Sequence, residues 1–403
     1  MAKLISADLT DNKLCMLEYT TTDGKLLSIK PDAFDAEIVS HTYTYIGRII
    51  FGKPITIIRE KAFLGCKSLT NVTIPDSVTT IREAAFRECT SLTNVKIPDS
   101  VTTIGEQAFC ECTSLTNVKI PNSVTTIGER AFHNCVSLEN VTIPNSVTTI
   151  GEWAFMGCKS LENVTIPDSV TTIGDQAFCC CTSLKEFKGK FAADNGRCLI
   201  IGGALNSFAI GCGATEYTIP DSVTTIGGYA FSSCTSLTSV TIPDSVTTIG
   251  DEAFMHCKSL TSVTIPDSVM TIGYKAFFDC TSLTSVTIPD SVTSIGNIAF
   301  AGCTSLTSVT IGDSVTSIGK HTFYLCIRLT SVTIGDSVTT IENGAFIGCS
   351  DIDMIICRAT TPPKLYISSE SKPTSFNKFS TLVVPTGCEE AYANSDWGYY
   401  LKE

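Results

Sequence analysis

The stretch LTNVTIPDSVTTIREAAFRECTS, residues Leu69–Ser91, decides the fold, because its 23-residue pattern recurs along most of the chain. The isoleucine before its proline returns at Ile74, Ile97, Ile120, Ile143, Ile166, Ile219, Ile242, Ile265, Ile288, Ile311 and Ile334. A unit this short cannot bury its apolar side chains alone, so consecutive units are expected to stack as the turns of one coil. The sequence therefore predicts one elongated repeat solenoid, in which each unit forms a rung.

Each rung is expected to begin with a strand. Leu69, Val72 and Ile74 follow the spacing L-x-x-L-x-L, which is typical of leucine-rich repeats. Polar residues alternate with these apolar ones, so the strand should bury one face and expose the other. Pro75 lacks a backbone N–H and ends the strand. Strands of successive rungs are expected to pair in parallel, about 4.8 Å apart.

The rest of the rung is expected to return along the far side of the coil. Val78 and Ile81 supply a second inward pair. The sequence Thr80–Glu83 matches a capping box, which predicts a single helical turn with Phe86 and Cys89 on its buried face. The predicted fold class is thus a leucine-rich repeat solenoid. It is a right-handed β/α-type coil with parallel strands on one face and short turns or helical turns on the other.

Twenty cysteines would suit a disulfide framework, but twelve of them share one repeat position. These are Cys66, Cys89, Cys112, Cys135, Cys158, Cys181, Cys234, Cys257, Cys280, Cys303, Cys326 and Cys349. Stacked at equal register, their side chains point the same way, whereas a disulfide needs opposed Cβ vectors. Zinc would need converging ligands at short spacings, which this column lacks. We expect reduced, buried thiols, and whether Cys198 and Cys212 pair is left open.

The composition limits the classes of function. Hydrophobic residues make up 43% of the 403 residues and charged residues 17%, which is typical of an ordered protein. The net charge is −12 and no Lys/Arg cluster occurs, which argues against a nucleic-acid partner. Lys3, Asp8, Asp11 and Lys13 interrupt the start, so no signal-peptide core and no membrane span are expected there. Export by another route, a removed signal and an intracellular location stay open, so the localisation is unknown.

The rungs share more than their spacing. Ile97-Pro98, Ile104-Gly105, Ala108-Phe109 and Cys112 occur together in one rung, and most other rungs repeat the combination. This pattern resembles the BspA-type leucine-rich repeat family, over about residues 51 to 352. The last part of the chain also looks like the end of such proteins, at Ala359–Pro363, Leu382–Pro385, Glu390–Tyr392 and Trp397. Modest departures are Gly312 and Gly335 in place of proline, and Arg82 and Glu342 in place of glycine.

The repeat predicts five segments. They are an N-terminal β-rich cap over 1–50, a first leucine-rich repeat block over 51–187, an insert over 188–217, a second block over 218–352 and a C-terminal cap over 353–403. The first cap contains a predicted hairpin around Asp23-Gly24. The insert has strand candidates at Cys198–Ile201 and Leu205–Ile210, separated by a Gly-Gly turn. It is expected to form an irregular rung, or else a β-hairpin that contacts a partner. The caps should cover the first and last rungs.

No catalytic constellation is visible in the sequence. His41, His133, His256 and His321 are widely separated in the repeat, and no Ser/His/Asp set converges on these spacings. Glycine-rich phosphate-binding loops are also missing from the sequence. We therefore predict a protein that is not an enzyme and uses no cofactor.

An acidic or amide side chain follows each strand. The column contains Asp76, Asp99, Asn122, Asn145, Asp168, Asp221, Asp244, Asp267, Asp290, Asp313 and Asp336. Neighbouring carboxylates would be able to share Ca²⁺, but calcium takes six to eight oxygen ligands and each rung offers one carboxylate. We favour a turn residue that hydrogen-bonds its own backbone. No metal site is predicted, and calcium binding is left open.

Two exposed surfaces are candidates for binding a partner. The strand face repeats hydroxyls, amides and two lysines along its rows, of which one reads Thr73, Lys96, Lys119, Thr142, Thr165, Thr218 and Thr241. Its candidate binding residues are Asn140, Thr142, Asn163 and Thr165. Aromatic residues concentrate at the turn, where the candidates are Trp153, Tyr229, Tyr274, Phe278 and Tyr324, joined by Met156, His133 and His256. Aromatic residues are enriched at binding hot spots, although packing against the next rung would also explain them.

The family resemblance implies bacterial, surface-associated proteins that bind host or neighbouring-cell components. The leading hypothesis is therefore a monomeric protein-interaction or adhesion module that binds a macromolecular partner, most simply a protein, over an extended solenoid face. One alternative is a glycan-binding protein that uses the strand-face ladder with Trp153 or Tyr274 as stacking platforms. Another is an intracellular scaffold, which the reduced thiols favour.

Overall fold

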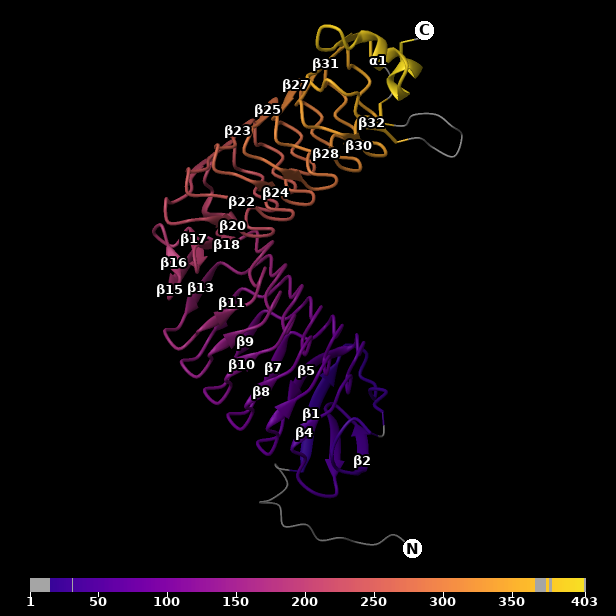
Figure 1. Ribbon diagram of the computed structural model, residues 1–403. Coiled ribbons are helices and arrows are strands. Elements are labelled where there is room, and N and C mark those ends of the chain that lie inside the picture. Colours follow the sequence, from indigo (N-terminus) through magenta and orange to yellow (C-terminus); the bar gives the residue numbers. More distant parts are fainter. Residues whose placement is uncertain (1–14, 31, 367–374, 377–378, 402–403) are drawn as a thin grey trace, which may run out of the picture. The chain divides into compact units, whose positions relative to one another are not determined.

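The computed structural model describes residues 15–30, 32–366, 375–376 and 379–401. Its contacts divide the chain into two compact units. Unit 1 runs to Leu199 and includes Ala209–Cys212, and unit 2 comprises Ile200–Phe208 with the chain from Gly213 onward. Each unit is a solenoid of short parallel strands with little helix, which confirms the predicted fold class (Figure 1). The sequence predicts one elongated body, whereas the contacts divide inside the predicted insert, where the 23-residue register is interrupted.

Unit 1 has two rows of parallel strands, one for each inward pair of the repeat. The first row contains β5 (Leu69–Thr73), β7 (Asn94–Lys96), β9 (Asn117–Lys119), β11 (Asn140–Thr142), β13 (Asn163–Ile166) and β15 (Glu186–Gly189). The second contains β4 (Ile57–Ile58), β6 (Thr80–Ile81), β8 (Thr103–Ile104), β10 (Thr126–Ile127), β12 (Thr149–Ile150) and β14 (Thr172–Ile173). Equivalent residues pair across rungs, as Val72 pairs with Val95 and Ile81 with Ile104. The predicted parallel register is confirmed.

Among the residues from 15 onward that the structure describes, three strands precede the rungs: β1 (Met16–Thr21), β2 (Ile38–Tyr43) and β3 (Gly47–Phe51). β1 runs antiparallel to both β3 and β5, so the outer edge of β5 has a partner. The predicted hairpin around Asp23-Gly24 is wrong. Gly24 does turn the chain, with φ of 65°, but both edges of β1 are already occupied and residues 25–30 form no strand. Residues 1–14, and with them the charges at Lys3, Asp8, Asp11 and Lys13, lie outside the described residues.

Unit 2 repeats the two rows. The first row contains β19 (Glu216–Thr218), β21 (Ser239–Thr241), β23 (Ser262–Thr264), β25 (Ser285–Ile288), β27 (Ser308–Ile311), β29 (Ser331–Ile334), β31 (Met354–Cys357) and β33 (Thr381–Val383). The second contains β18 (Ala204–Phe208), β20 (Thr225–Ile226), β22 (Thr248–Ile249), β24 (Thr271–Ile272), β26 (Ser294–Ile295), β28 (Ser317–Ile318), β30 (Thr340–Ile341) and β32 (Lys364–Leu365). After β33 come α1 (Glu389–Ala393) and the 3₁₀ turn η2 (Asp396–Tyr399). The Trp397 indole donates to the Pro363 carbonyl at 2.8 Å, and the Tyr392 hydroxyl donates to the Ala359 carbonyl at 2.8 Å.

Phenylalanine rings stack along the core of each unit. In unit 1 the stack contains Phe63, Phe86, Phe109, Phe132, Phe155 and Phe178, and in unit 2 it contains Phe231, Phe254, Phe277, Phe300, Phe323, Phe346 and Phe376. Neighbouring centroids lie between 4.8 and 5.4 Å apart, with rings within 9° of parallel. The repeat therefore places equivalent side chains directly above one another, as the sequence predicts.

The segment that carries these rings is not helical. Ala84 and Glu88 adopt left-handed φ of 51° and 60°, which an α-helical turn cannot contain. The N–H groups of Ala84, Phe86 and Glu88 each donate to a carbonyl oxygen of the next rung at 2.8 Å. The predicted helical turn is wrong, although Phe86 and Cys89 are buried as predicted. A single helical turn would leave its first N–H groups unpaired, whereas this conformation pairs them between rungs.

The cysteine column forms no disulfide, and the described residues contain no disulfide elsewhere. In ten rungs the thiol donates to the carbonyl of the phenylalanine 26 residues earlier, as Cys89 Sγ does to Phe63 at 3.1 Å. Burial raises the pKa of Cys303 to about 12, so this thiol stays protonated at neutral pH. The predicted burial is confirmed for eleven of the twelve thiols of the column, whereas Cys66 is half-buried, and no disulfide joins Cys198 to Cys212.

The insert continues the rungs in an irregular form. β15 pairs in parallel with β13 in unit 1, and β18 pairs in parallel with β20 in unit 2. β16 (Ala192–Ala193) and the start of β17 (Cys198–Ile201) form a short antiparallel pair that the sequence did not predict. The second strand candidate ends at Phe208, and Ile210–Cys212 is a 3₁₀ turn, η1. Leu205 and Phe208 are buried, so the segment serves the core.

Candidate functional site

Two consecutive rungs of unit 2 bring aromatic and charged side chains together on the turn segment. We call His256, Tyr274, Lys275, Phe278 and Asp279 the aromatic–cation cluster. Lys275 Nζ lies 4.9 Å from the Tyr274 ring centroid and 5.7 Å from that of Phe278. The His256 ring packs edge-on against Phe278 at 5.5 Å, and its Nδ1 lies 2.9 Å from Asp279 Oδ2. Cation–π attraction and this polar contact hold the cluster in one arrangement.

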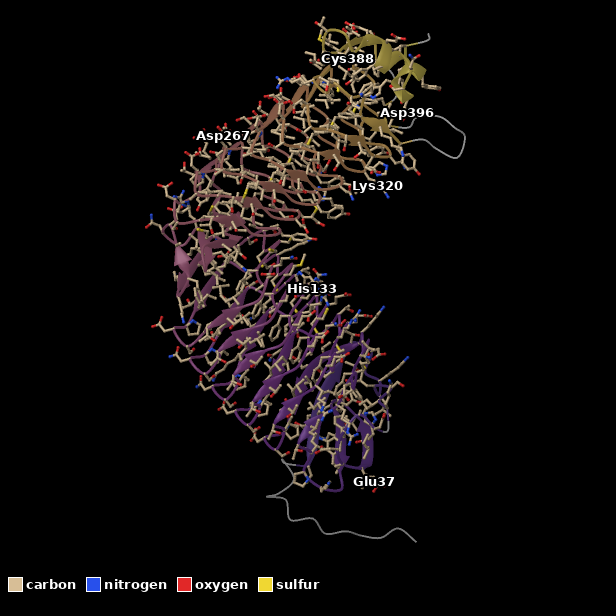
Figure 2. The ribbon with its side chains drawn as sticks, in the orientation of Figure 1. Glu37, His133, Asp267, Lys320, Cys388 and Asp396 are labelled. Atoms are coloured by element: carbon tan, nitrogen blue, oxygen red, sulfur yellow. The ribbon has the colours of Figure 1, made fainter. Side chains whose placement is uncertain are left out.

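Large apolar side chains of unit 2 reach solvent along the same turn segment. Tyr274 is 39% exposed, Tyr324 37%, Leu325 42% and Ile327 43%. The Tyr324 ring packs edge-on against His321, with centroids 5.3 Å apart. Lys320 is exposed beside them, and it lies on the opposite side of unit 2 from Asp267, a member of the acidic column (Figure 2). Exposed rings beside cations are typical of protein-binding surfaces.

The turn segment of unit 1 has a different character. The guanidinium carbon of Arg130 lies 3.8 Å from the Trp153 ring centroid, and Trp153 Nε1 donates to Gln176 Oε1. The indole is therefore held by both neighbouring rungs. Ion pairs occupy other positions of this segment, including Arg82–Glu60 at 2.7 Å and Arg130–Glu129 at 2.8 Å. Several charged side chains of this segment therefore have partners within unit 1.

The structure thus separates the predicted aromatic candidates. Tyr274 and Phe278 lie in one cluster, and Tyr324 occupies the same turn position as Phe278 two rungs further along. Tyr229 is half-buried earlier in unit 2. Trp153 belongs to unit 1, where Arg130 covers it. These residues therefore do not form one continuous aromatic patch within either unit.

The strand-face candidates Asn140, Thr142, Asn163 and Thr165 are all exposed, on β11 and β13. The Asn140 amide donates to Asn117 Oδ1 at 3.5 Å, so the amides of adjacent rungs touch. Other hydroxyls of the face point along the coil, as Thr93 Oγ1 donates to the Thr70 carbonyl at 3.1 Å. Trp153 lies in the turn segment rather than on this face, so the ladder and its proposed stacking platform are not brought together.

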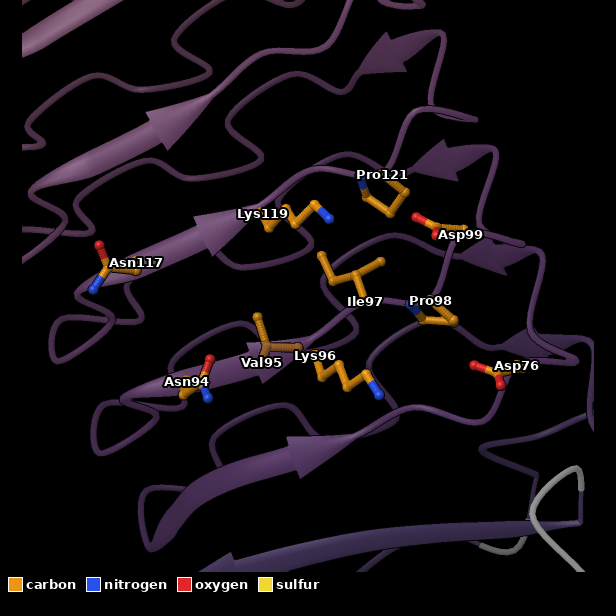
Figure 3. Close-up of a pocket in the computed structure, with 10 residues that line it drawn as sticks. All are labelled: Asp76, Asn94, Val95, Lys96, Ile97, Pro98, Asp99, Asn117, Lys119 and Pro121. Atoms are coloured by element: carbon orange, nitrogen blue, oxygen red, sulfur yellow. The ribbon is translucent and has the colours of Figure 1, made fainter.

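A hollow opens on the strand face of unit 1 over β7 and β9 (Figure 3). Its volume is about 500 Å³, and Val95 and Ile97 lie among its lining residues. We call this depression the lysine hollow. Its polar lining residues are Asp76, Asn94, Lys96, Asp99, Asn117 and Lys119. The sequence places the two lysines in a repeated row of the strand face, but they were not among the predicted binding residues. Their departure from the threonine of neighbouring rungs was the available signal.

A cysteine and a histidine meet on the turn segment of unit 1. Cys110 Sγ lies 3.6 Å from His133 Nδ1. Burial raises the pKa of Cys110 to about 11, and burial followed by the nearby Arg130 charge lowers the pKa of His133. Both groups are therefore neutral near pH 7, unlike the thiolate–imidazolium pair of a cysteine nucleophile. No group of three or more His, Cys, Asp or Glu side chains is arranged to hold a metal ion in the part of the chain that the structure describes.

The acidic column after the strands has a local structural role in two rungs. Asp290 Oδ1 accepts the backbone N–H of Asp313 at 2.8 Å, and Asp313 Oδ1 accepts that of Asp336 at 3.1 Å. Gly312 makes the first approach possible, because a Cβ there would lie 2.5 Å from the Pro289 carbonyl oxygen. The predicted bond to the residue's own backbone is therefore replaced in these rungs by a bond to the next rung.

Within the described ranges, no helix has the length and apolar character needed to cross a bilayer.

Comparisons with known proteins agree with this architecture. A family model described as "BspA type Leucine rich repeat region" matches residues 28–135, 102–192, 205–297 and 270–362. A leucine-rich cell surface protein from Faecalibacterium prausnitzii is 30% identical, with a TM-score of 0.59 over 84% of this chain and 93% of its own. A leucine-rich repeat protein from Bacteroides ovatus is 27% identical, with a TM-score of 0.56 over 91% and 93%.

The pneumococcal vaccine antigen PcpA shares the fold, with a TM-score of 0.70 at 20% identity, over 90% of this chain and 99% of its own. A search of curated proteins found no significant match.

Proposed function

Because this chain belongs to the BspA-type leucine-rich repeat family, we propose that it is a non-enzymatic interaction module that binds a protein partner. The solenoid supplies a long surface built from repeated elements, which suits a macromolecule better than a small ligand. The neighbour from F. prausnitzii is described as a cell surface protein, and this supports a bacterial adhesion role with a host or neighbouring-cell component as the partner.

The observation that carries the proposal is the exposure of Tyr274, Tyr324 and Leu325 on the turn segment of unit 2. Aromatic residues of this kind supply much of the binding energy in protein interfaces once a partner covers them. Lys275 lies over the Tyr274 ring and 3.9 Å from Glu252, so the cluster offers apolar area beside a positive charge that is partly balanced. The other aromatic candidates, Tyr229, Phe278 and Trp153, are proposed to stabilise the binding surface. They do so either from beside the contact or by packing within their own rungs. The strand-face candidates Asn140, Thr142, Asn163 and Thr165 are proposed as a secondary contact row.

Affinity capture from host and bacterial surface extracts tests the proposal. The double variant Tyr274→Ser/Tyr324→Ser removes the exposed rings, and Thr241→Ala/Thr264→Ala on the strand face of the same unit serves as the matched control. A partner that binds the wild-type chain and the control, but not the ring variant, supports the proposal. Equal capture by all three chains would contradict the choice of surface.

An intracellular scaffold is the second candidate, and thiols that form no disulfide favour it because a reducing compartment preserves them. Fractionation of the native cells separates the two. Recovery in the cytosol alone would remove the adhesion role, whereas recovery at the surface would remove the scaffold.

A further inference from the structure

The lysine hollow places two lysines on adjacent strands, and neither of them contacts a carboxylate of the described chain closely enough to form an ion pair. Lys96 and Lys119 are both exposed on β7 and β9, which pair in parallel at Asn94 and Asn117. At the strand spacing of about 4.8 Å, like charges at equivalent positions repel one another. Among the described residues, neither ammonium takes part in an ion pair. The two ammonium groups are therefore available to an anionic group of an occupant, although Asp76 and Asp99 balance their charge within the whole lining.

Other lysines of the same face form ion pairs with glutamates. Lys185 Nζ lies 3.0 Å from Glu162 Oε2, and Lys188 Nζ lies 2.6 Å from Glu186 Oε1. Lys188 stands in the same row as Lys96 and Lys119, because it pairs with Thr165 on β13. The repeat is therefore able to place a glutamate beside a lysine, and it does not do so in the hollow.

The hollow also offers groups that accept hydrogen bonds. The Lys96 and Lys119 side chains lie along neighbouring strands and extend toward the side where Asp76 and Asp99 stand (Figure 3). The two carboxylates accept hydrogen bonds and the amides of Asn94 and Asn117 both donate and accept them. A ligand with negative charge alone would meet repulsion from the carboxylates. A ligand with one anionic group beside several hydroxyl groups would satisfy every side chain.

We infer that the lysine hollow binds an acidic saccharide, in which Lys96 and Lys119 hold a carboxylate or sulfate. Asp76 and Asp99 accept hydrogen bonds from neighbouring sugar hydroxyls, and Asn94 and Asn117 bind hydroxyl groups across the two strands. A volume of about 500 Å³ falls in the range of sites for small ligands. The site is independent of the turn segment proposed for a protein partner.

The hollow continues toward the start of unit 1. A second depression of about 280 Å³ shares Asp76 and Lys96 with it and adds Glu18 and Thr73, on β1 and β5. Four neighbouring strands, β1, β5, β7 and β9, therefore carry one run of polar depressions. An oligosaccharide that lies across the strands would occupy both, so affinity is expected to rise from a monosaccharide to a tetrasaccharide.

An acidic peptide fits this place less well. An extended peptide gains affinity by adding its backbone to a free strand edge. β7 lies between β5 and β9, and β9 lies between β7 and β11, so both strands already have partners on each side. A peptide would have only side chains to contact, and Asp76 and Asp99 would oppose its carboxylates. Sugar hydroxyls turn the same two carboxylates into favourable contacts.

Calorimetric titration of the full chain with defined probes tests the inference. The probes are a uronic-acid tetrasaccharide, a sulfated tetrasaccharide, a neutral tetrasaccharide of equal length and tetraglutamate. Binding of the uronic or sulfated probe that weakens with added salt is expected, and the arm that binds more tightly identifies the anionic group. Failure of both acidic probes, or equal binding of the neutral one, would overturn the inference. Preferential binding of tetraglutamate would replace it with a peptide site.

Substitutions locate the site. Lys96→Thr/Lys119→Thr restores the residue of neighbouring rungs, so the fold is preserved, and it should weaken the acidic saccharide about tenfold or more. Lys185→Thr/Lys188→Thr removes the same charge from the same face and is the matched control, with affinity expected within about twofold. Equal losses in both variants would show that net charge alone attracts the ligand, which contradicts a built site.

The carboxylates give a second, opposite signature. Asp76→Asn/Asp99→Asn removes negative charge but keeps the side-chain shape. Under the inference, this variant binds the acidic saccharide more weakly, because it loses two acceptors for hydroxyl groups. It should at the same time bind tetraglutamate more tightly, because the repulsion is gone. Tighter binding of both probes would mean that only charge matters, and the saccharide assignment would be wrong.

Discussion

The two units of this chain share an interior and differ in their surfaces. Both stack phenylalanine rings about one strand spacing apart, and in both the cysteine thiol donates to a phenylalanine carbonyl. On the surface, the strand face of unit 1 carries Asn, Lys and Glu, whereas that of unit 2 repeats Ser and Thr from β21 to β29. On the turn segment both units carry ion pairs, such as Arg82–Glu60 in unit 1 and Lys258–Asp279 in unit 2, and unit 2 in addition exposes aromatic rings.

This difference indicates where each unit is able to bind. The interior is under the constraint that every rung must match its neighbours, so its residues hardly change along the coil. The exposed positions are free of that constraint. A residue that departs from the repeat at such a position is therefore not required by packing between rungs. Lys96 and Lys119 are such departures in unit 1, and Tyr274 and Tyr324 are such departures in unit 2. Opposite faces of the rung are thus specialised in the two units.

Raising the pH should have the largest effect, because it acts on the shared interior of both units. Burial raises the pKa of Cys303 to about 12 and that of Cys135 well above its ordinary value near 9. The thiols therefore lose their protons at a lower pH in the unfolded chain than in the folded chain. The free energy of unfolding keeps its full value below about pH 9 and falls as the pH rises further. Each fully buried thiol contributes a loss of about 1.4 kcal/mol per pH unit above 9.

Urea unfolding in the presence of a reducing agent, followed by circular dichroism from pH 7.5 to 10.5, measures this loss. Both units should lose several kcal/mol by about pH 10, because several thiols titrate together. The variant Cys135→Ala/Cys303→Ala should show a shallower decline. A midpoint that stays constant up to pH 10.5 would contradict the burial of the thiols.

Removing one ring from each stack tests whether the interiors are equivalent. Phe132 and Phe277 are both fully buried, with a ring on either side. Phe132→Ala and Phe277→Ala should each lower the free energy of unfolding by about 3 to 5 kcal/mol, because each leaves a cavity that the rungs cannot close. Chemical denaturation compares them, with the conservative Phe→Leu change at each site as the control. A loss in one unit alone would mean that the two cores are not equivalent.

The shared interior is also the part that the sequence predicts well. The period places Ile, Phe and Cys in columns, and parallel pairing follows because equivalent residues must stack. The conformation of the turn was not predicted, since Thr80–Glu83 imitates a capping box while the backbone satisfies its N–H groups between rungs. The N-terminal hairpin failed for a similar reason, because pairing of β1 with distant β3 and β5 outweighed a local turn signal.

The binding surfaces were predicted only in part. An aromatic residue in the repeat looks the same in sequence whether its ring is covered or exposed. Trp153 and Tyr274 were chosen for the same reason, yet Arg130 covers one ring and 39% of the other side chain is exposed. Their neighbours one rung away decide the outcome, and these contacts depend on side-chain direction rather than on spacing. The lysine hollow was missed because a depression depends on several rungs at once.

Replacing these two aromatic residues should sharpen the comparison of the turn segments. Trp153→Ala removes a ring packed by Arg130 and hydrogen-bonded to Gln176, so a loss of about 1 to 2 kcal/mol in stability is expected. Tyr274→Ala should cost less, about 0.5 to 1 kcal/mol, because 39% of this residue already faces solvent. Thermal and urea unfolding measure both. Partner capture should show the reverse order, with Tyr274→Ala the more damaging change. Equal effects of the two variants in both assays would contradict the proposed difference between the turn segments of the two units.

The smallest effect on stability is expected from copying the lysine pair into unit 2. Thr264 and Thr287 are exposed on β23 and β25, in the same row as Lys96 and Lys119. Thr264→Lys/Thr287→Lys should change the free energy of unfolding by less than about 0.5 kcal/mol, since exposed charges interact weakly. Asp244 and Asp267 already stand where Asp76 and Asp99 do, so adding Ser262→Asn/Ser285→Asn completes the set of side chains. Calorimetry with the acidic tetrasaccharide should then detect a second site. If the variant with the two lysines alone binds as tightly as the variant with lysines and asparagines, the asparagines contribute nothing. If neither variant binds the tetrasaccharide, the strand faces of the two units differ in more than their side chains.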